Sequence, residues 1–598
     1  MPLKTLLVSH GTCCQAAGAK QVHTALQKEL TRRNLHDQVA LKQTGCHGFS
    51  RLDPVVVLEP DGILFAGVNE EDAPGIVQSL MPGGEKPQYL FYTDPRTFEK
   101  ITLKDKIPFF NKQKRLVLHN CGIVNPADID DYINTGGYKA LLKAVSGMTP
   151  SDVVEEIKKS GLRGLGGGGY STGNKLELCA KAAGSAKYII CNADEGDPGS
   201  FQDRSVLEGD PHAALEGMLT AGYAVGATKG YIYVRAEYPH AIRKIKEALH
   251  QAKNRGFFGR NILESGFNFE VDIFEGAGAF VCGEETALLQ SLHGERGMPY
   301  SRPPYPVVSG FQGKPTLINN VKTLANLRWI INGGAAYFAK TGTKSSKGTA
   351  IFSLSGDVNN CGLVEVPMGV SLREIIFGIG GGIPGGKAFK AVQTGGPSGG
   401  CLPAQFLDTA VDFDTLRDAG SIMGSGGMVV MDEQTCMVDT ARYFLAFSLK
   451  ELCGQCVPCR LGTRQMLEIL NRIGRGQGKH SDLDLLEELG EAVARGSLCG
   501  LGKTVPNPVL TTLRYFRDEY EAHISEKRCP ARVCKNLITY RIDAQKCKAC
   551  ARCLKACPAG AISGTDKQAH AIDQNLCIRC GICLDACSER FEAVKCIS

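Results

Sequence analysis

The chain has 598 residues, a net charge of +6 and 25 cysteines. A chain of this length is too long to fold around a single hydrophobic core, so we expect roughly three to five domains. Lys and Arg are scattered among acidic residues and no apolar run reaches about eighteen residues, so we expect neither a nucleic-acid nor a membrane partner. The N-terminal apolar run is too short for a secretory signal. We therefore expect a cytoplasmic protein whose cysteines are metal ligands or buried thiols.

The first 95 residues have the pattern of a small α/β domain. Apolar runs typical of strands alternate with amphipathic stretches typical of helices. The strands are predicted over 4–10, 39–44, 55–60 and 63–68, and the helices over 19–33 and 71–80. The charged stretch that follows is predicted to be an extended linker arm.

A glycine-rich stretch follows a predicted helix whose N-cap is Ser151. Six glycines lie between Gly164 and Gly173, and Lys175 closes the run with a positive charge. The backbone N–H groups of such a loop can surround a phosphate. Because a helix rather than a strand precedes it, the loop is not the dinucleotide-binding fingerprint. A flexible connector is the alternative, but the acidic segment 192–199, directly after an apolar strand, favours a ligand site.

Four motifs in a fixed order carry a family resemblance. They are GLRGLGGGGYSTGNKL (161–176), CNADEGDPGSFQDR (191–204), GAGAFVCGEETAL (276–288) and GKPTLINNVKT (313–323). Together they resemble the flavin- and NADH-binding subunit of respiratory complex I and its relatives in soluble hydrogenases and formate dehydrogenases. The resemblance covers about residues 140–525.

The resemblance implies two sets of binding residues. Glycine and polar positions would hold FMN, namely Gly164, Gly166, Gly167, Gly168, Gly169, Lys175, Asn192, Asp194, Glu195, Asn319 and Asn320. Aromatic and acidic positions would contact NADH, namely Tyr170, Asp197, Phe280, Glu284 and Glu285. The chain departs from the family pattern at Leu165, Gly168, Leu176 and Asp197. The loss of Trp at position 176 and the shorter carboxylate of Asp197 imply a reshaped, though not a lost, nicotinamide pocket. Hydride transfer depends on positioning and on exclusion of water, so no catalytic acid or base is expected.

The resemblance also implies a multidomain chain of α/β and α+β parts. These parts are a thioredoxin-like ferredoxin domain (1–95), the linker arm (96–135), a complex I-type FMN- and NADH-binding α/β domain (136–340), a ubiquitin-like β-grasp module (341–425), a helical 4Fe–4S domain (426–525), a zinc linker (526–540) and a two-cluster 4Fe–4S ferredoxin domain (541–598).

In the long hydrogenase-type members of this family, the N-terminal domain holds a 2Fe–2S cluster on two cysteine pairs. Here the four ligand positions align with Ser9, Cys14, Cys46 and Ser50. Because two of them are serines, we expect no 2Fe–2S cluster and a degenerate docking domain instead. A cluster that uses Cys13 as a replacement ligand is the alternative.

One cysteine set follows the β-grasp module. Cys453, Cys456 and Cys459 have the C-x2-C-x2-C spacing with which three thiolates hold three corners of a 4Fe–4S cluster. Cys499, after the helical stretch 483–495, is the predicted fourth ligand, and in the family this cluster lies beside the flavin. A zinc site is the competing interpretation, although zinc sites seldom use this pattern.

The last 60 residues contain an internal repeat of C-x2-C-x2-C-x3-C, the pattern of a bacterial two-cluster ferredoxin. In that pattern each fourth cysteine binds the other cluster. One 4Fe–4S cluster is therefore assigned to Cys547, Cys550, Cys553 and Cys587, and the other to Cys577, Cys580, Cys583 and Cys557.

A third kind of metal site is predicted in the connector between these modules. His523, Cys529 and Cys534 are spaced widely enough to surround one tetrahedral Zn²⁺ ion, and Cys436 is the predicted fourth ligand. A disulfide or a pair of buried thiols is the alternative.

We interpret the chain as a flavoprotein that exchanges hydride with NAD(H) on FMN and electrons with three 4Fe–4S clusters. Its tail most resembles the flavin subunit of electron-bifurcating FeFe hydrogenases, which couple NADH and reduced ferredoxin to H2. The implied partners are a catalytic FeFe hydrogenase subunit, a small 2Fe–2S thioredoxin-like subunit and ferredoxin.

Two other functions stay open. The first is a diaphorase subunit of an NAD(P)-linked formate dehydrogenase or NADP-reducing hydrogenase, and the second is an electron-relay or docking subunit with a vestigial flavin site. The choice between NAD and NADP is also open, because four basic residues are candidates for a 2′-phosphate contact: Arg163, Arg204, Arg235 and Lys187.

Overall fold

The computed structural model describes residues 4–184, 186–565, 567–587 and 591–598. Small parts of the predicted domains 1–95, 136–340 and 541–598 therefore lie outside the described residues. The chain forms two compact units, residues 1–430 and 431–598. Within the described ranges, no helix has both the length and the apolar character of a membrane-crossing segment.

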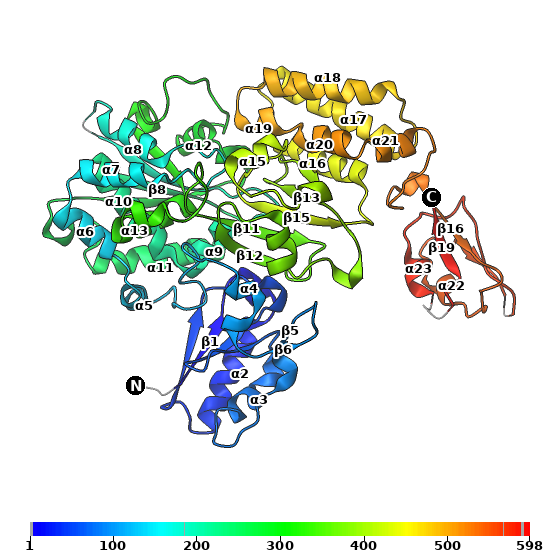
Figure 1. The fold of residues 1–598 in the computed structure, drawn as a ribbon, viewed down its shortest axis with the longest axis horizontal. Coiled ribbons are helices and arrows are strands. Elements are labelled where there is room, and N and C mark those ends of the chain that lie inside the picture. The colour runs from blue at the N-terminus through cyan, green and yellow to red at the C-terminus, as the bar shows by residue number, and fades with distance from the viewer. Residues whose placement is uncertain (1–3, 185, 566, 588–590) are drawn as a thin grey trace. The chain divides into compact units, whose positions relative to one another are not determined.

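The N-terminal domain is a four-stranded sheet with helices packed against it (Figure 1). The strand order is β2-β1-β3-β4, in which β1 and β2 are parallel and the β1–β3 and β3–β4 pairs are antiparallel. All the strands and helices predicted here are present, and the elements are β1 (Lys4–Ser9), α1 (Thr12–Ala16), α2 (Ala19–Arg32), β2 (Val39–Thr44), β3 (Val56–Glu59), β4 (Ile63–Phe65) and α3 (Ala73–Gln78). Apolar side chains of β1 and α2 form its core.

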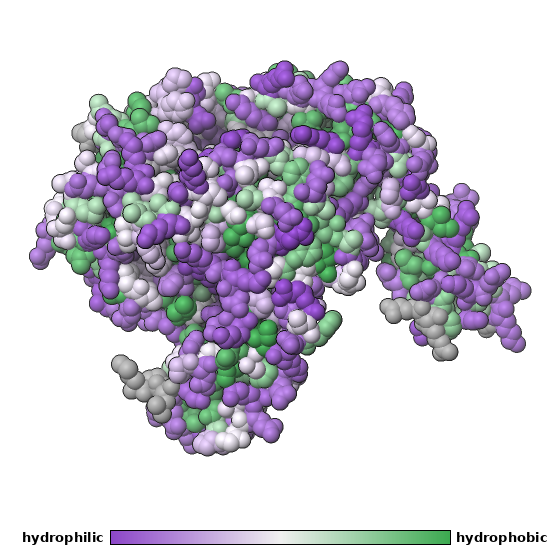
Figure 2. All heavy atoms as spheres, viewed as in Figure 1, coloured by the Kyte–Doolittle hydropathy of each residue, from purple (hydrophilic) through white to green (hydrophobic). Residues whose placement is uncertain are grey.

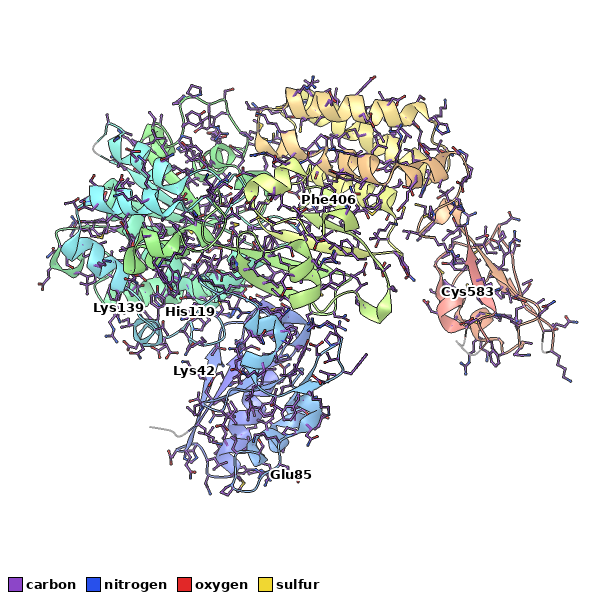
Figure 3. The ribbon with its side chains drawn as sticks, in the orientation of Figure 1. Lys42, Glu85, His119, Lys139, Phe406 and Cys583 are labelled. Atoms are coloured by element: carbon purple, nitrogen blue, oxygen red, sulfur yellow. The ribbon has the colours of Figure 1, made fainter. Side chains whose placement is uncertain are left out.

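This domain is bound to the next one by polar contacts and by close backbone packing. Thr12 donates from both its backbone N–H, at 2.7 Å, and its hydroxyl to the buried carboxylate of Glu208. Lys42 on β2, labelled in Figure 3, pairs with Asp131 at 2.5 Å. A Cβ on Gly45 would lie 2.4 Å from the Cα of Gly209. The loops that follow β1 and β2 therefore pack directly on α9 (Gln202–Gly209).

A parallel four-stranded sheet is the centre of the second domain. Its strands are β7 (Tyr188–Ala193), β8 (Lys229–Arg235), β9 (Glu270–Gly276) and β10 (Thr316–Asn320), in the order β10-β7-β8-β9. The helices α10 (Pro211–Val225) and α13 (Val321–Gly333) pack against β7. α10 is buried along nearly its whole length, as expected for a helix without a polar face.

The glycine loop connects α7 (Pro150–Ser160) to α8 (Thr172–Lys181). The predicted N-cap at Ser151 is wrong, because Pro150 takes the first helical position and Thr149 caps the helix. Proline fits that position since its missing N–H would have no partner there. Thr149 and Asp152 form a capping box, with N–H donors at 3.2 and 2.9 Å.

A five-stranded mixed sheet follows the parallel one. Its strands, in the order β12-β11-β15-β13-β14, are β11 (Thr349–Gly356), β12 (Gly362–Pro367), β13 (Phe389–Thr394), β14 (Cys401–Pro403) and β15 (Gly427–Asp432). The helix α15 (Phe413–Asp418) connects β14 to β15. β11 pairs antiparallel with β12 and parallel with β15.

The second unit begins as a helical bundle and ends as a small ferredoxin-like part. The bundle consists of α16 (Met437–Glu451), α17 (Thr463–Gly474), α18 (Ser481–Gly496), α20 (Asn507–Tyr515) and α21 (Arg517–Ile524). Figure 2 shows mainly hydrophilic side chains over α18, while its apolar positions join the bundle core. The tail contains β16 (Thr539–Ile542), α22 (Arg552–Ala556), β17 (Ile562–Ser563), β18 (Ala571–Ile572), α23 (Ile582–Ala586) and β19 (Val594–Ile597). β16 pairs with β19, and β17 with β18.

Gly173 is predicted to be essential for the packing of α8 on α7. A Cβ at this position would lie 2.3 Å from the Cα of Lys158, so the backbones would have to separate. Gly173→Ala should lower the free energy of unfolding by about 1–3 kcal/mol. Gly147→Ala is the control, because a Cβ at that helical glycine meets nothing within 4 Å. Equal denaturant midpoints for the two flavin-free variants would contradict this explanation of the packing.

Candidate functional site

The carboxyl ends of β7 and β10 bring two of the motifs together. Their parallel pairing sets Asn319 opposite Cys191 and Asn320 opposite Asn192. The acidic motif continues from the end of β7, and the GAGAF motif follows the end of β9. β7 lies between β10 and β8, at the point where the strand order reverses. Open α/β sheets bind their ligands outside the carboxyl ends of the strands at such a point.

The glycine loop passes close to this edge. Gly167 and Gly169 have φ values of 118° and 60°, which favour glycine. A Cβ on Gly166 would lie 3.1 Å from the Asn320 Cβ, whereas one on Gly168 would meet no atom within 4 Å. The loop therefore touches the end of β10 and borders open space just before α8. A left-handed glycine backbone beside a helix N-terminus is suited to an anion such as phosphate.

Two predicted residues, one for each ligand, meet in an ion pair. Lys175 on α8 pairs with Glu285, and its Nζ also donates to the carbonyl of Ile318 at 2.6 Å. The neighbouring Glu284 caps α12 (Glu285–Leu292) and accepts two N–H groups of its first turn at 2.8 and 3.0 Å. The lysine, the acidic pair and the end of β10 thus form one connected polar group.

Sequence reasoning missed Arg302. Its guanidinium lies 4.0 Å from the Glu284 carboxylate and 3.8 Å from that of Glu285, and it stacks over Tyr305. The segment SRPPYP that contains it has no motif that would have drawn attention to it. A guanidinium at this edge adds a phosphate-binding group where the dinucleotide is predicted to lie.

Two of the predicted acidic residues shape the turn after β7. Glu195 accepts the first three N–H groups of α9, at 2.8, 3.1 and 3.1 Å, and so caps that helix. Burial, together with the charge of Asp203, raises the pKa of Glu195 to about 7. Asp197 accepts the N–H of Gly199 at 2.9 Å and the hydroxyl of Ser200 at 2.8 Å. Their contacts with FMN and NADH remain predictions.

The hydrogen bonds of the three predicted asparagines show whether the carboxyl ends of β7 and β10 fit a flavin. Asn192 donates to the Gly283 carbonyl at 3.0 Å, and Asn320 caps α13 and donates to Asp203 at 2.5 Å. The Asn319 Nδ2 group is buried and has no hydrogen-bond partner among the described residues. A buried amide donor without a partner is costly, and a polar ligand would satisfy it. The residues at the end of β10 therefore fit the polar edge or ribityl chain of FMN.

The two predicted aromatic contacts differ in exposure. Tyr170, directly after the glycine loop, is 56% exposed, so its ring face is accessible to a planar ligand. Phe280 is half-buried, and a Cβ on Gly196 would lie 2.6 Å from its ring. Gly196 in the acidic motif is therefore required for the close approach of Phe280.

The first cysteine set lies at one end of the helical bundle. Cys453, Cys456 and Cys459 lie between α16 and α17, and Cys499 is the N-cap of the short helix α19 (Gly500–Thr504). Burial and the nearby Cys499, Cys456 and Cys453 thiols raise the pKa of Cys459 to about 11, so the other three cysteines are neighbours of Cys459. The N–H of Leu498 donates to Cys456 Sγ at 3.4 Å, a contact typical of cluster thiolates.

The ferredoxin repeat is also a repeat of backbone conformation. Left-handed residues lie two positions after the first cysteine and one after the second in each half, at Ala549 and Ala551 and at Arg579 and Gly581. Burial and nearby thiols, among them Cys587 from the other half, raise the pKa of Cys553. Cys583 is on α23 (Figure 3). Cys587 thus lies near the first three cysteines of the other half, as predicted, and the assignment of Cys557 to the second cluster stays a prediction.

His570 is a second residue that sequence reasoning missed. It is buried in the ferredoxin part, and its Nδ1 lies 3.8 Å from Cys547 Sγ. A hydrogen bond to a cluster ligand is one of the ways in which a protein tunes the reduction potential. No spacing signal connects a lone histidine to a cysteine 23 residues away.

The four predicted zinc ligands come together, and all four are buried. Their ligand atoms, in Cys436, His523, Cys529 and Cys534, lie within 4.8 Å of one another. Cys436 Sγ lies 3.4 Å from His523 Nε2 and 3.8 Å from Cys534 Sγ. His523 Nδ1 bonds to the Glu519 carbonyl at 2.7 Å, which fixes the ring with Nε2 towards the thiols.

Comparisons with known proteins match these sites in the same order. The Nuo51 FMN-binding domain family matches residues 157–329, the NADH-ubiquinone oxidoreductase-F iron-sulfur binding region matches 439–523, and the 4Fe-4S dicluster domain matches 546–591. The chain is 54% identical over 459 residues to the NADP-reducing hydrogenase subunit HndC of Solidesulfovibrio fructosivorans, across 77% of this chain and 93% of that protein. The chain belongs to the NADH-binding FMN flavoprotein subunits of the complex I 51-kDa type. It is therefore an oxidoreductase subunit with an FMN-binding domain and 4Fe–4S-binding regions.

Two further matches support the same family assignment. An NADH-quinone oxidoreductase subunit of Rhizobium meliloti is 45% identical over 415 residues, which are 69% of this chain and 99% of that protein. The solved structure of an NAD+-reducing [NiFe]-hydrogenase in the H2-reduced state superposes with a TM-score of 0.62 at 29% identity. That match covers 88% of this chain and 84% of the hydrogenase chain, so the multidomain α/β fold is shared along most of the length.

Asn319→Leu is predicted to separate flavin binding from stability. The substitution removes a buried amide without a partner, so the flavin-free chain should be as stable as wild type or more stable. FMN should bind about tenfold more weakly, because its polar partner is lost. Fluorescence titration of the flavin-free chain and denaturant unfolding measure the two effects.

Asn320→Leu is the comparison for the stability part of this prediction. It removes the cap of α13 and the bond to Asp203, so it should lower the stability of the flavin-free chain by about 1 kcal/mol. Unchanged FMN affinity in Asn319→Leu would show that this amide does not contact the flavin.

Proposed function

We propose that this chain is the NAD(H)-oxidoreducing FMN iron–sulfur subunit of an electron-bifurcating FeFe hydrogenase, in which NADH and reduced ferredoxin together form H2 reversibly. The observation that carries the proposal is the combination, in one chain, of the family's flavin domain with a two-cluster ferredoxin repeat. Three 4Fe–4S clusters would connect the flavin chemistry to partners.

The residues of the sheet edge would mainly position the ligands. When bound, FMN supplies the conversion between two-electron hydride transfer and one-electron transfer to the clusters. The glycine loop and Lys175 would hold the phosphate, and Asn319 would bond to a polar edge of the flavin. Glu284, Glu285 and Arg302 would orient the dinucleotide. Accurate positioning of nicotinamide and flavin accounts for most of what a protein adds to hydride transfer.

The surface around the second tail cluster is suited to the docking of a redox partner. Leu576, Ile578 and Ile582 flank the ligands Cys577 and Cys580, and they are 54%, 58% and 40% exposed. Exposed apolar side chains beside a cluster provide a surface on which another electron carrier can dock close to the metal. The partners proposed are ferredoxin, the catalytic FeFe hydrogenase subunit and a small 2Fe–2S thioredoxin-like subunit.

An NADP-linked hydrogenase is the second candidate, and two observations favour it. One is the 54% identity to an NADP-reducing hydrogenase subunit. The other is Arg235 at the carboxyl end of β8, whose Nη1 has no hydrogen-bond partner in the described part of the chain. Lys187 precedes β7 and lies at the opposite edge of the sheet, so it is removed from the 2′-phosphate candidates.

A hydrogen assay on the native complex tests the proposed reaction. The complex would be purified without oxygen, its subunits identified, and H2 measured with NADH, NADPH and reduced ferredoxin, singly and in pairs. H2 formed only from NADH and reduced ferredoxin together is the expected result. H2 formed from NADPH alone would support the NADP-linked alternative, and a complex without a hydrogenase subunit would contradict both.

A structural Zn²⁺ ion is proposed for Cys436, His523, Cys529 and Cys534. The distances between these ligands match a tetrahedral site, and Zn²⁺ prefers this mixture of sulfur and nitrogen. Cys436→Ser should lose about one zinc ion per chain and keep its iron. Cys179→Ser, which changes a buried thiol in the flavin-domain core, should keep both. Elemental analysis that finds equal zinc in the two variants would rule the site out.

A further inference from the structure

A second tetrahedral group of metal ligands lies in the N-terminal domain. The ligand atoms of Cys13, Cys14, Cys46 and Asp53 lie within 4.8 Å of one another. Cys13 Sγ is 3.7 Å from Cys46 Sγ, which is 3.4 Å from Asp53 Oδ2. Cys14 and Cys46 are buried. Only Cys14 and Cys46 belong to the four positions that align with 2Fe–2S ligands, so this is a different set.

These distances fit one metal ion rather than a 2Fe–2S cluster. A tetrahedral ion with bonds of about 2.3 Å to sulfur sets its ligands about 3.8 Å apart, and about 3.5 Å where one ligand is oxygen. A 2Fe–2S cluster divides its ligands into two pairs on two irons, so ligands of different pairs are far apart. The observed distances, 3.7 Å between two sulfur atoms and 3.4 Å between sulfur and oxygen, match the geometry of a single ion. They are also close to the ligand-to-ligand distances of 3.8 Å and 3.4 Å in the Cys436 site.

The surrounding hydrogen bonds orient these ligands. Ser9, at one of the lost cysteine positions, donates to Asp53 Oδ1 at 3.2 Å and accepts the N–H of Val55 at 3.0 Å. The serine therefore holds the carboxylate that takes part in the new set. The N–H of Gly48 donates to Cys46 Sγ at 3.2 Å, as backbone amides do at metal-bound thiolates.

The group also lies where the N-terminal domain meets the flavin domain. Cys13 and Cys14 follow Thr12, whose N–H and hydroxyl bond to Glu208, and Cys46 follows Gly45, which packs on Gly209. An ion here would join the two loops that form this contact.

We propose that Cys13, Cys14, Cys46 and Asp53 bind one Zn²⁺ ion that closes the β1 and β2 loops of the N-terminal domain against α9. Four protein ligands leave no open position, so the site is structural. Zn²⁺ has no redox chemistry, so no electron passes through this domain.

Metal analysis of the full chain tests this site separately from the Cys436 site. Cys13→Ser and Cys46→Ser should each lose about one zinc ion per chain and keep wild-type iron and FMN. Ser9→Ala should weaken zinc binding about 10–100-fold, because the carboxylate loses its orienting hydroxyl. Cys121→Ser, a buried thiol at the same interface and outside the set, should keep both zinc ions.

A spectroscopic measurement covers the case in which these variants fold poorly. In the Cys436→Ser chain, Co²⁺ added in place of Zn²⁺ should show thiolate-to-cobalt charge transfer and tetrahedral d–d bands from the N-terminal site alone. Loss of iron in Cys46→Ser would show a cluster instead of zinc. Unchanged zinc in Cys13→Ser and Cys46→Ser, a disulfide detected between Cys13 and Cys46, or absence of the cobalt bands would each overturn the proposal.

Discussion

The flavin domain depends on the parallel pairing of β7 with β10. This pairing sets Asn320 beside Asn192 and brings segments more than a hundred residues apart in the sequence to one sheet edge. The local structure supports that edge, because Asn320 caps α13, Glu195 caps α9 and Glu284 caps α12. Asn320 and Glu284 are therefore the residues directly before their helices, and Glu195 holds the first turn of a helix that begins seven residues later. The same groups that fix the fold leave the buried amide of Asn319 available for a ligand.

The metal sites follow a different physical rule, because short spacings and local backbone conformation determine them. The left-handed residues at Ala549 and Ala551 recur at Arg579 and Gly581, so the two halves of the tail share one local backbone conformation around their first two cysteines. Such sites can be read directly from spacing. The Cys436 set also needs the tertiary fold, which brings together residues 87 apart in the sequence.

The sequence predicted the elements of the N-terminal domain, the strand before the acidic motif and the convergence of the Cys436 set. It could not predict positions that depend on three-dimensional contact. Arg302 reaches the acidic pair because its loop contacts the first turn of α12, where the Tyr300 N–H donates to the Thr286 hydroxyl, and His570 reaches Cys547 only through the tail fold. Asp53 was missed because a carboxylate is not part of a cysteine motif. The cap at Thr149 was misplaced because Pro150 takes the first helical position.

We infer that one chain combines an FMN site with three 4Fe–4S clusters and has no iron in its N-terminal domain. Flavin, iron and sulfide analysis of the anaerobically purified chain, with low-temperature electron paramagnetic resonance after NADH reduction, tests this inference most directly. We expect one FMN and about twelve iron atoms per chain, with 4Fe–4S signals only. A 2Fe–2S signal, about eight iron atoms, or a chain that binds no FMN would contradict it.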